Sequence, residues 1–293
     1  MKKPDLSSSR RHDTDMTQGS VFGHLLRFSL PLLAGNIFQQ LYNTVDTWVV
    51  GNYVSNEAFS AVGTVAPIIN MLIGAFTGFA TGAGVVISQY YGAKEPDKVH
   101  DAVHTSIMLT IILTVVLTAV GILTTPAMLR FMKTPAEVMP ESTEYLTIYF
   151  AGMIGLLFYN MGAGILRAVG DSRRPFYYLV VAAVINTVLD LVFVINFKMG
   201  VAGVAYATII AQAVSALLTM ITLCRSDSCI RVRFRDLRIH GIMLKKTVQI
   251  GIPAGLQSLM YNVSGTFNQA KFNTFGTDVV AAWTVLGKVD GLS

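Results

Sequence analysis

Two carboxylic acids lie inside apolar segments of the chain that are long enough to cross a membrane. Asp46 lies within Leu25–Gly51, and Asp190 lies within Phe176–Phe197, with Asn186 one helical turn before it. An ionisable side chain in hydrocarbon costs at least ~2.5 kcal/mol on insertion scales, and such groups commonly mark an ion or proton pathway. The two aspartates are therefore the first candidates for the working site.

The depths of these residues in the membrane can be compared, because a helix rises ~1.5 Å per residue. From the nearer end of its segment, Asp46 is expected about 8 Å deep, Asp190 about 10 Å and Thr208 about 9 Å. Asn186 presents an amide on the same face as Asp190. These four residues form an oxygen-only set that suits a hard cation such as Na⁺. Because two neighbouring carboxylates do not readily both ionise in a low dielectric, the site is expected to hold either a proton or a cation.

A polar stripe follows the first apolar segment, where Asn36, Gln40 and Asn43 recur at helical spacing with Gln39 beside them. A polar stripe in a membrane must face protein or water. We therefore expect a substrate cavity lined by residues of the first and fourth apolar segments, and the candidates are Asn36, Gln39, Gln40, Asn43, Tyr159 and Asn160. Amide side chains also hold helices together, and this alternative stays open for Asn36 and Gln39.

Composition indicates that the chain folds in a bilayer. Of its 293 residues, 53% are hydrophobic and 13% charged, against roughly 25% charged in soluble domains. The mean hydropathy is +0.55. Because ~20 apolar residues span a bilayer as a helix, we predict an all-α membrane protein. The predicted spans are 25–51, 58–90, 103–124, 145–168, 176–197, 202–224 and 249–272. An eighth span begins near 279, and the sequence stops before it could cross the membrane, so we expect the chain to be incomplete.

Basic residues predict the orientation. Seventeen Lys and Arg fall on the N-terminal side of the bundle, in the first 27 residues and the segments 91–102, 167–175 and 225–248, against three in the loops at the other side. Because Lys and Arg are retained on the cytosolic side, we expect a multi-pass protein of the plasma (inner) membrane with a cytosolic N-terminus. The basic run after residue 225 is then a cytosolic linker beside anionic lipid, and no nucleic-acid partner is needed to explain it.

An internal repeat divides the chain. Leu30–Asp46 has a counterpart in Ile252–Asn268 at an offset of about 222 residues. The repeat predicts a cytosolic N-terminal segment (1–24), a six-helix N-lobe (25–224), a basic linker (225–248) and the start of a second, pseudo-symmetric lobe (249–293). By this symmetry the whole protein would have twelve helices. Gly74, Gly78 and Gly82 repeat every four residues, which favours close packing against another helix over contact with substrate.

The chain resembles the multidrug and toxic compound extrusion (MATE) family. The resemblance is carried by the run QQLYNTVD at Gln39–Asp46 after Pro31, SQYYGA at Ser88–Ala93, LRAVGDSRRP at Leu166–Pro175 and NTVLD at Asn186–Asp190. It implies a twelve-helix antiporter that exports organic cations in exchange for H⁺ or Na⁺.

The resemblance also implies a branch of the family. In the DinF-like branch, an acid on the first helix, Asn and Asp on the fifth and Thr on the sixth form the cation site, and Asp46, Asn186, Asp190 and Thr208 match them. The NorM type carries an acid on the seventh helix, where Gln249–Phe272 has none. We therefore expect the N-lobe to handle the coupling ion.

The predicted function is a secondary active antiporter that works as a monomer, without a cofactor, on small amphipathic organic cations. No Gly-x-x-x-x-Gly-Lys-Ser/Thr motif occurs, so ATP is not expected to drive it. A lipid-linked precursor flippase is the alternative within the same superfamily, and it would need cationic residues along its cavity. A membrane-embedded enzyme is the alternative of another class. It would need acids clustered within the membrane or a Ser/His/Asp constellation, whereas Asp46 and Asp190 lie isolated and deep in separate apolar segments.

Overall fold

The computed structural model of the chain describes residues 21–54, 56–132 and 134–272. Some side chains within these helices fall outside the description, among them those of residues 40–48 and 265–272. The described elements are α1 (Val21–Tyr53), α2 (Asn56–Gly92), α3 (Pro96–Phe131), α4 (Met139–Ala151), α5 (Met153–Ala168), α6 (Arg173–Leu191), the π-helical turn η1 (Val192–Asn196), α7 (Gly200–Arg225), the 3₁₀ turn η2 (Phe234–Asp236) and α8 (Gly241–Phe272). Every regular element in this part of the chain is a helix, as predicted.

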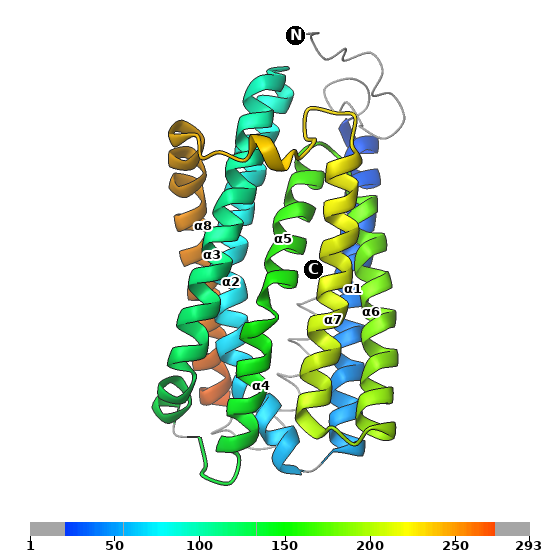
Figure 1. Ribbon diagram of the computed structural model, residues 1–293, viewed down its shortest axis with the longest axis vertical. Coiled ribbons are helices and arrows are strands. Elements are labelled where there is room, and N and C mark those ends of the chain that lie inside the picture. The colour runs from blue at the N-terminus through cyan, green and yellow to red at the C-terminus, as the bar shows by residue number, and fades with distance from the viewer. Residues whose placement is uncertain (1–20, 55, 133, 273–293) are drawn as a thin grey trace.

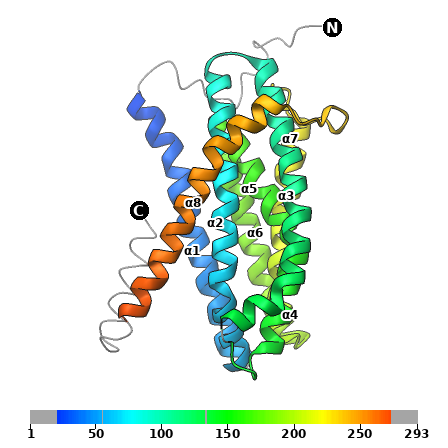
Figure 2. The same ribbon diagram turned by 90° about the vertical axis from the view of Figure 1, so that its left-hand side faces the viewer.

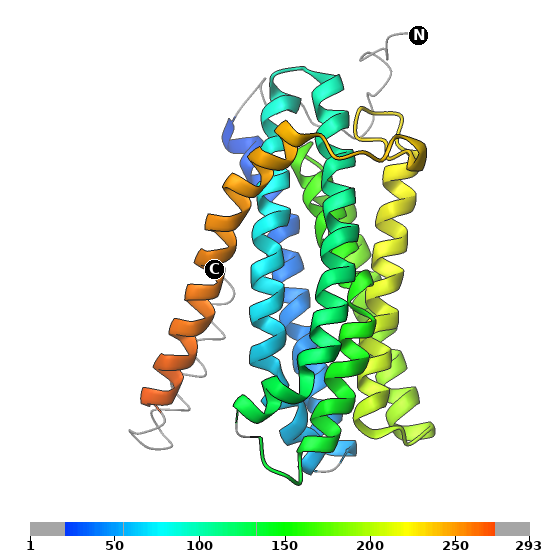
Figure 3. The same ribbon diagram turned by 60° about the vertical axis from the view of Figure 1, so that its left-hand side comes forward.

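The helices form an elongated bundle. On one side α1 packs against α6, and α6 against α7 (Figure 1). The centre is filled by α2, α3, α4 and α5, and α5 also packs against α7. The last helix, α8, crosses the outside of α2 obliquely, and its far end diverges from the bundle (Figures 2 and 3). The apolar core therefore lies around α2 and α5, with α1 and α8 at the periphery.

Four described helical segments are long and apolar enough to cross a membrane by themselves, and the bent pair α4 and α5 adds a fifth. The four are Ala61–Gly92, Pro96–Phe131, Arg173–Asn196 and Gly200–Arg225. The helices α1 and α8, predicted as the first and seventh spans, are 33 and 32 residues long and are not among these segments. Several side chains of both helices lie outside the description.

The predicted fourth span, 145–168, is two helices rather than one. The helices α4 and α5 meet at Gly152 with a bend of 48°. A Cβ atom at Gly152 would lie 2.2 Å from Ile209 Cγ2 on α7, so glycine permits the close contact at the bend. Beside it, the Thr118 hydroxyl on α3 donates a hydrogen bond to the Phe150 carbonyl at 3.1 Å. Contacts with two neighbouring helices thus accompany the change of direction.

A side-chain acceptor marks the start of α6, and a π-helical turn follows its end. At its start, Asp171 Oδ1 accepts hydrogen bonds from the backbone N–H groups of Arg173 at 3.2 Å and Arg174 at 3.1 Å. A carboxylate at a helix N-terminus satisfies donors that have no partner within the helix. At its other end, α6 runs directly into the π-helical turn η1. Single π-helical turns within helices occur frequently at functional sites.

The glycine ladder of α2 lies against α8, as expected for helix packing. A Cβ atom at Gly78 would lie 2.2 Å from the Gly255 backbone nitrogen, and one at Gly82 would lie 2.5 Å from the Thr247 carbonyl oxygen. The two backbones therefore meet directly. The helix α8 begins at Gly241, whereas the predicted apolar span begins at 249, because the first turns of the helix carry the exposed residues Lys245 and Lys246.

Candidate functional site: a buried polar cluster beside a cavity

Three of the four predicted ion-site residues lie buried on two adjoining helices. Asn186 and Asp190 on α6 are 0% exposed, and Thr208 on α7 is 6% exposed. The Asn186 amide Nδ2 donates a hydrogen bond to Thr208 Oγ1 at 3.4 Å, and Thr208 Oγ1 in turn donates to the Val204 carbonyl at 2.9 Å. We call Asn186, Asp190 and Thr208 the polar cluster.

The carbonyl oxygen of Asn186 is the most informative atom of the polar cluster. It is buried and accepts no hydrogen bond from the part of the chain that the structure describes. Leaving a buried acceptor without a partner costs about 1–3 kcal/mol, so such an atom calls for a functional or structural reason. One helical turn further on, Asp190 places a carboxylate on the same face. An amide oxygen, a carboxylate and a hydroxyl together can coordinate a hard cation or hold a proton.

Asp46 lies on α1, but its side chain is outside the described residues, as are those of Gln40 and Asn43. The structure does show that α1 packs against α6. Phe38 and Phe176 meet edge to face with their ring centroids 5.8 Å apart. The contribution of Asp46 to the polar cluster therefore stays a prediction, on a helix that packs beside α6.

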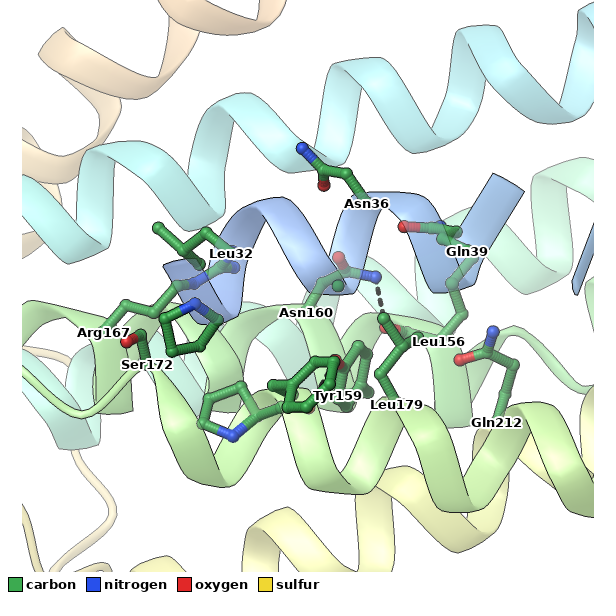
Figure 4. A pocket seen from close by; sticks show the side chains of 14 residues that line it. Leu32, Asn36, Gln39, Leu156, Tyr159, Asn160, Arg167, Ser172, Leu179 and Gln212 are labelled. Atoms are coloured by element: carbon green, nitrogen blue, oxygen red, sulfur yellow. Dashed lines mark hydrogen bonds between the residues drawn. The ribbon is translucent and has the colours of Figure 1, made fainter. Parts of the chain in front are cut away.

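A cavity of about 110 Å³ opens between α1, α5, α6 and α7 (Figure 4). Its polar lining includes four of the predicted cavity residues, and the full polar set is Asn36, Gln39, Tyr159, Asn160, Arg167, Ser172 and Gln212. The apolar lining comes mainly from Pro31, Leu32, Leu156, Pro175, Phe176 and Leu179. The structure thus brings Asn36, Gln39, Tyr159 and Asn160 to one cavity, and whether they bind substrate stays a prediction.

Hydrogen bonds to nearby carbonyl groups hold several lining side chains in place. The Tyr159 hydroxyl donates to the Pro175 carbonyl at 3.1 Å, which ties α5 to the start of α6. Asn160 Nδ2 donates to the Leu156 carbonyl at 2.8 Å, so its own oxygen remains available as an acceptor. Arg167 Nε donates to the Ala163 carbonyl at 3.2 Å. The lining is therefore an ordered arrangement of amide, hydroxyl and aromatic groups with one cation.

Three polar lining residues, Arg167, Ser172 and Gln212, were not predicted to face the cavity. Gln212 follows Thr208 by four residues, so helical spacing already placed it on the same face of α7. Arg167 was counted among the basic residues of the segment 167–175. The structure places its side chain at the cavity, while Asp171 forms the hydrogen bonds that begin α6. Gln212 also connects the two features, because it lies one helical turn from the polar cluster.

The described residues contain no group of three or more His, Cys, Asp or Glu suited to a metal ion. Cys224 and Cys229, the two cysteines of this part of the chain, form no disulfide there. The polar cluster, which presents oxygen ligands, stays the predicted ion site.

The MatE family model matches residues 31–192, more than half of the chain. Among curated proteins, the chain is 31% identical to the "Probable multidrug resistance protein YoeA" of Bacillus subtilis over 92% of this chain and 60% of the relative. It is 29% identical to the "Probable multidrug resistance protein YpnP" of the same organism over 95% of this chain and 62% of the relative. The chain thus spans about three-fifths of the length of these relatives.

Two solved structures that resemble this chain are of MOP superfamily transporters. A structure described as the outward-facing conformation of a multidrug resistance MATE family transporter of the MOP superfamily matches with a TM-score of 0.86 and 28% identity, over 96% of this chain and 65% of that one. A MOP superfamily transporter from Pyrococcus furiosus matches with a TM-score of 0.87 and 27% identity, over 96% of this chain and 63% of that one. The match of the family model, together with the fold, shows that the chain belongs to the MatE family, whose members are membrane transporters and not enzymes.

Proposed function

We propose that this protein is a secondary active exporter of small organic compounds that exchanges them for H⁺ or Na⁺. The observation that carries the proposal is the buried Asn186 carbonyl oxygen, which has no hydrogen-bond partner among the described residues and lies one turn from Asp190. The names of the curated relatives, which are multidrug resistance and multidrug export proteins, support export as the direction of transport.

The coupling ion binds at the polar cluster in this proposal, with Asp46 completing the site from α1. Asp190 supplies the charge, Asn186 Oδ1 and Thr208 Oγ1 supply neutral oxygen ligands, and Asp46 supplies a second carboxylate. This set is the one that the DinF-like branch of the family implies. Oxygen ligands of this kind suit Na⁺, and the same carboxylates can hold a proton instead.

Coupling requires that the ion bind two conformations of the protein with different affinity. In our proposal α1 is the element that changes, because Pro31 lies inside it and lines the cavity. A proline within a helix removes a backbone hydrogen bond and allows a bend. Ion binding between α1 and α6 would then favour one shape of α1 and release the substrate outward.

The substrate is proposed to occupy the cavity between α1, α5, α6 and α7. Its volume of about 110 Å³ is well below the ~300–1,000 Å³ of pockets for drug-sized ligands. Export therefore requires this cavity to widen, or to be extended by residues outside those described. Asn160 Oδ1 and Gln39 offer acceptors to an organic cation, and the Tyr159 ring offers a face for a cation–π contact.

The flippase alternative is less well supported. Recognition of a lipid-linked pyrophosphate calls for several cationic side chains, and the described lining contains Arg167 as its one cation. Amide and aromatic groups predominate instead.

The membrane orientation belongs to this proposal as well. The α2–α3 loop, the α5–α6 turn and the segment between α7 and α8 all carry basic residues and all lie at one end of the bundle (Figure 1). We infer that this end faces the cytosol and that the protein acts as a monomer in the plasma membrane.

The proposal is tested by measuring efflux of a fluorescent organic cation from vesicles containing the protein, with pH and Na⁺ gradients imposed separately. We expect one of the two gradients to drive transport against the dye gradient. A transport rate that depends on neither gradient, or a requirement for ATP, would contradict the proposal.

A further inference from the structure

The segment that joins α7 to α8, residues 226–240, is held by hydrogen bonds to the N-terminal part of α3. The Arg233 backbone N–H donates to His104 Nε2 at 3.1 Å, and the His240 backbone N–H donates to Thr105 Oγ1 at 3.1 Å. Ile230 is 2% exposed and Val232 is 3% exposed, so both anchor the segment in the core. The linker is therefore an ordered strap across this end of the bundle.

The outer face of the same segment is unusually apolar. Phe234 is 71% exposed, and Ile242, at the start of α8, is 70% exposed. Ile239 between them is 44% exposed. The strap thus carries an exposed aromatic and an exposed aliphatic side chain, and a second exposed aliphatic side chain follows at the start of α8, while Ile230 and Val232 pack inward. Such a patch indicates an interaction surface.

The charge around this patch is strongly positive. Residues 225–248 carry seven Lys and Arg against two Asp, so their net charge of +5 equals that of the whole chain. In the described part of the chain no ion pair involves the guanidinium groups of Arg233, Arg235 and Arg238, and all three residues are exposed. By contrast, the ammonium group of Lys246 has a hydrogen-bond partner, because its Nζ donates to the Tyr90 hydroxyl at 2.7 Å.

The level of the strap fits a membrane surface. It crosses the bundle closer to the centre than the tip of the α2–α3 hairpin does (Figures 1 and 3). The outward apolar side chains are therefore at the ends of the helices rather than far beyond them. Arg beside exposed aromatic and aliphatic side chains is the composition of segments that lie in the headgroup region of an anionic bilayer.

We propose that Phe234, Ile239 and Ile242, with Arg233, Arg235 and Arg238, form an interfacial face that binds the anionic phosphate head groups of the adjacent leaflet. Guanidinium groups bind phosphate oxygens in pairs of hydrogen bonds, and the apolar side chains enter the acyl boundary between them. Charge complementarity favours this occupant, because the segment 225–248 has a net charge of +5 and phosphate head groups are anionic.

The test measures binding of fluorescent phosphatidylglycerol to the purified protein in mixed micelles, with phosphatidylcholine as the neutral competitor. We expect phosphatidylglycerol to bind selectively, and added salt to weaken it. The triple variant R233Q/R235Q/R238Q should bind it about fivefold more weakly for each charge removed. The matched control R130Q/K198Q removes two cations from the opposite end and should leave the affinity unchanged.

A second variant separates the face from simple loss of charge. Phe234→Ser keeps every cation, and it should weaken binding of phosphatidylglycerol in the same mixed micelles while the thermal unfolding temperature stays unchanged. Equal affinity for phosphatidylcholine, or an unchanged affinity in the triple variant, would overturn the proposal. Full competition by soluble glycerol phosphate, or binding of lipid only together with a soluble protein, would also overturn it. Because no transport is measured, the result is independent of the proposed export function.

Discussion

At the scale of single residues, the polar cluster is defined by how Asn186 uses its two amide atoms. Its nitrogen donates a hydrogen bond to Thr208 Oγ1 at 3.4 Å, while its oxygen is buried without a hydrogen-bond partner among the described residues. Thr208 therefore fixes the direction in which the Asn186 oxygen points. A residue that orients an ion ligand in this way should affect ion affinity more than folding.

Substitution of Thr208 tests this role. Thr208→Val removes the hydroxyl that receives the Asn186 amide, whereas Thr208→Ser retains it. Loss of such a bond costs about 1–3 kcal/mol, so the ion concentration for half-maximal transport should rise roughly tenfold in the valine variant. The serine variant should stay near the original value. Equal ion dependence in the two variants would show that the hydroxyl has no part in ion binding.

Part of the site follows from the sequence because helical register is simple. Asn186 and Asp190 are four residues apart, so their shared face was predictable, and the burial of both agrees with it. The hydrogen bond between Asn186 and Thr208 depends on how α6 and α7 pack, which spacing along the chain does not define. The place of Arg167 at the cavity was not predicted, because the sequence showed only that this residue belongs to a basic segment at the end of the bundle.

At the scale of elements, the closest helix contact is between α2 and α8, where glycine brings the backbones together. A Cβ atom at Gly78 would lie 2.3 Å from Gly255 Cα and 2.6 Å from the Gly251 carbonyl oxygen. Backbone atoms cannot move aside as a flexible side chain can. In the proposed two-lobe arrangement, α8 is the helix that the repeat assigns to the second lobe, so this contact would join the two lobes.

Alanine substitutions on α2 test this contact. Gly78→Ala should destabilise the protein by about 1–3 kcal/mol, because overpacking forces the two helices apart. Gly63→Ala is the matched control on the same helix, since its Cβ would meet nothing within 4 Å. Thermal unfolding in detergent should show a lower midpoint for Gly78→Ala than for Gly63→Ala. Equal midpoints would mean that α8 does not pack on α2 as described.

Hydropathy predicted the positions of the helices better than their shapes. Seven of the predicted spans fall in the described part of the chain, and six of them are each a single α-helix over most of their length. The span 145–168 instead consists of two helices, α4 and α5, that meet at Gly152. The π-helical turn η1 was also not predicted. Hydropathy reports which solvent a segment prefers, whereas bends and π-helical turns depend on contacts such as that of Gly152 with Ile209.

At the scale of the whole molecule, the polar cluster and the cavity share α6 and α7, and α1 lines the cavity while packing on α6. Movement of α1 would therefore affect both features at once. This shared wall is the physical basis that we propose for coupling. Because coupling between two ligands is a reciprocal free energy, a substrate gradient should also drive the ion.

The most direct test of coupling reverses the exchange in proteoliposomes. An imposed substrate gradient should drive counterflow of H⁺ or Na⁺ through the unaltered protein. It should do so equally through Glu144→Gln, which neutralises an exposed acid on α4. Asp190→Asn should abolish the ion counterflow, because the buried carboxylate is lost while the side-chain volume is kept. Ion counterflow through Asp190→Asn at the original rate would contradict the account.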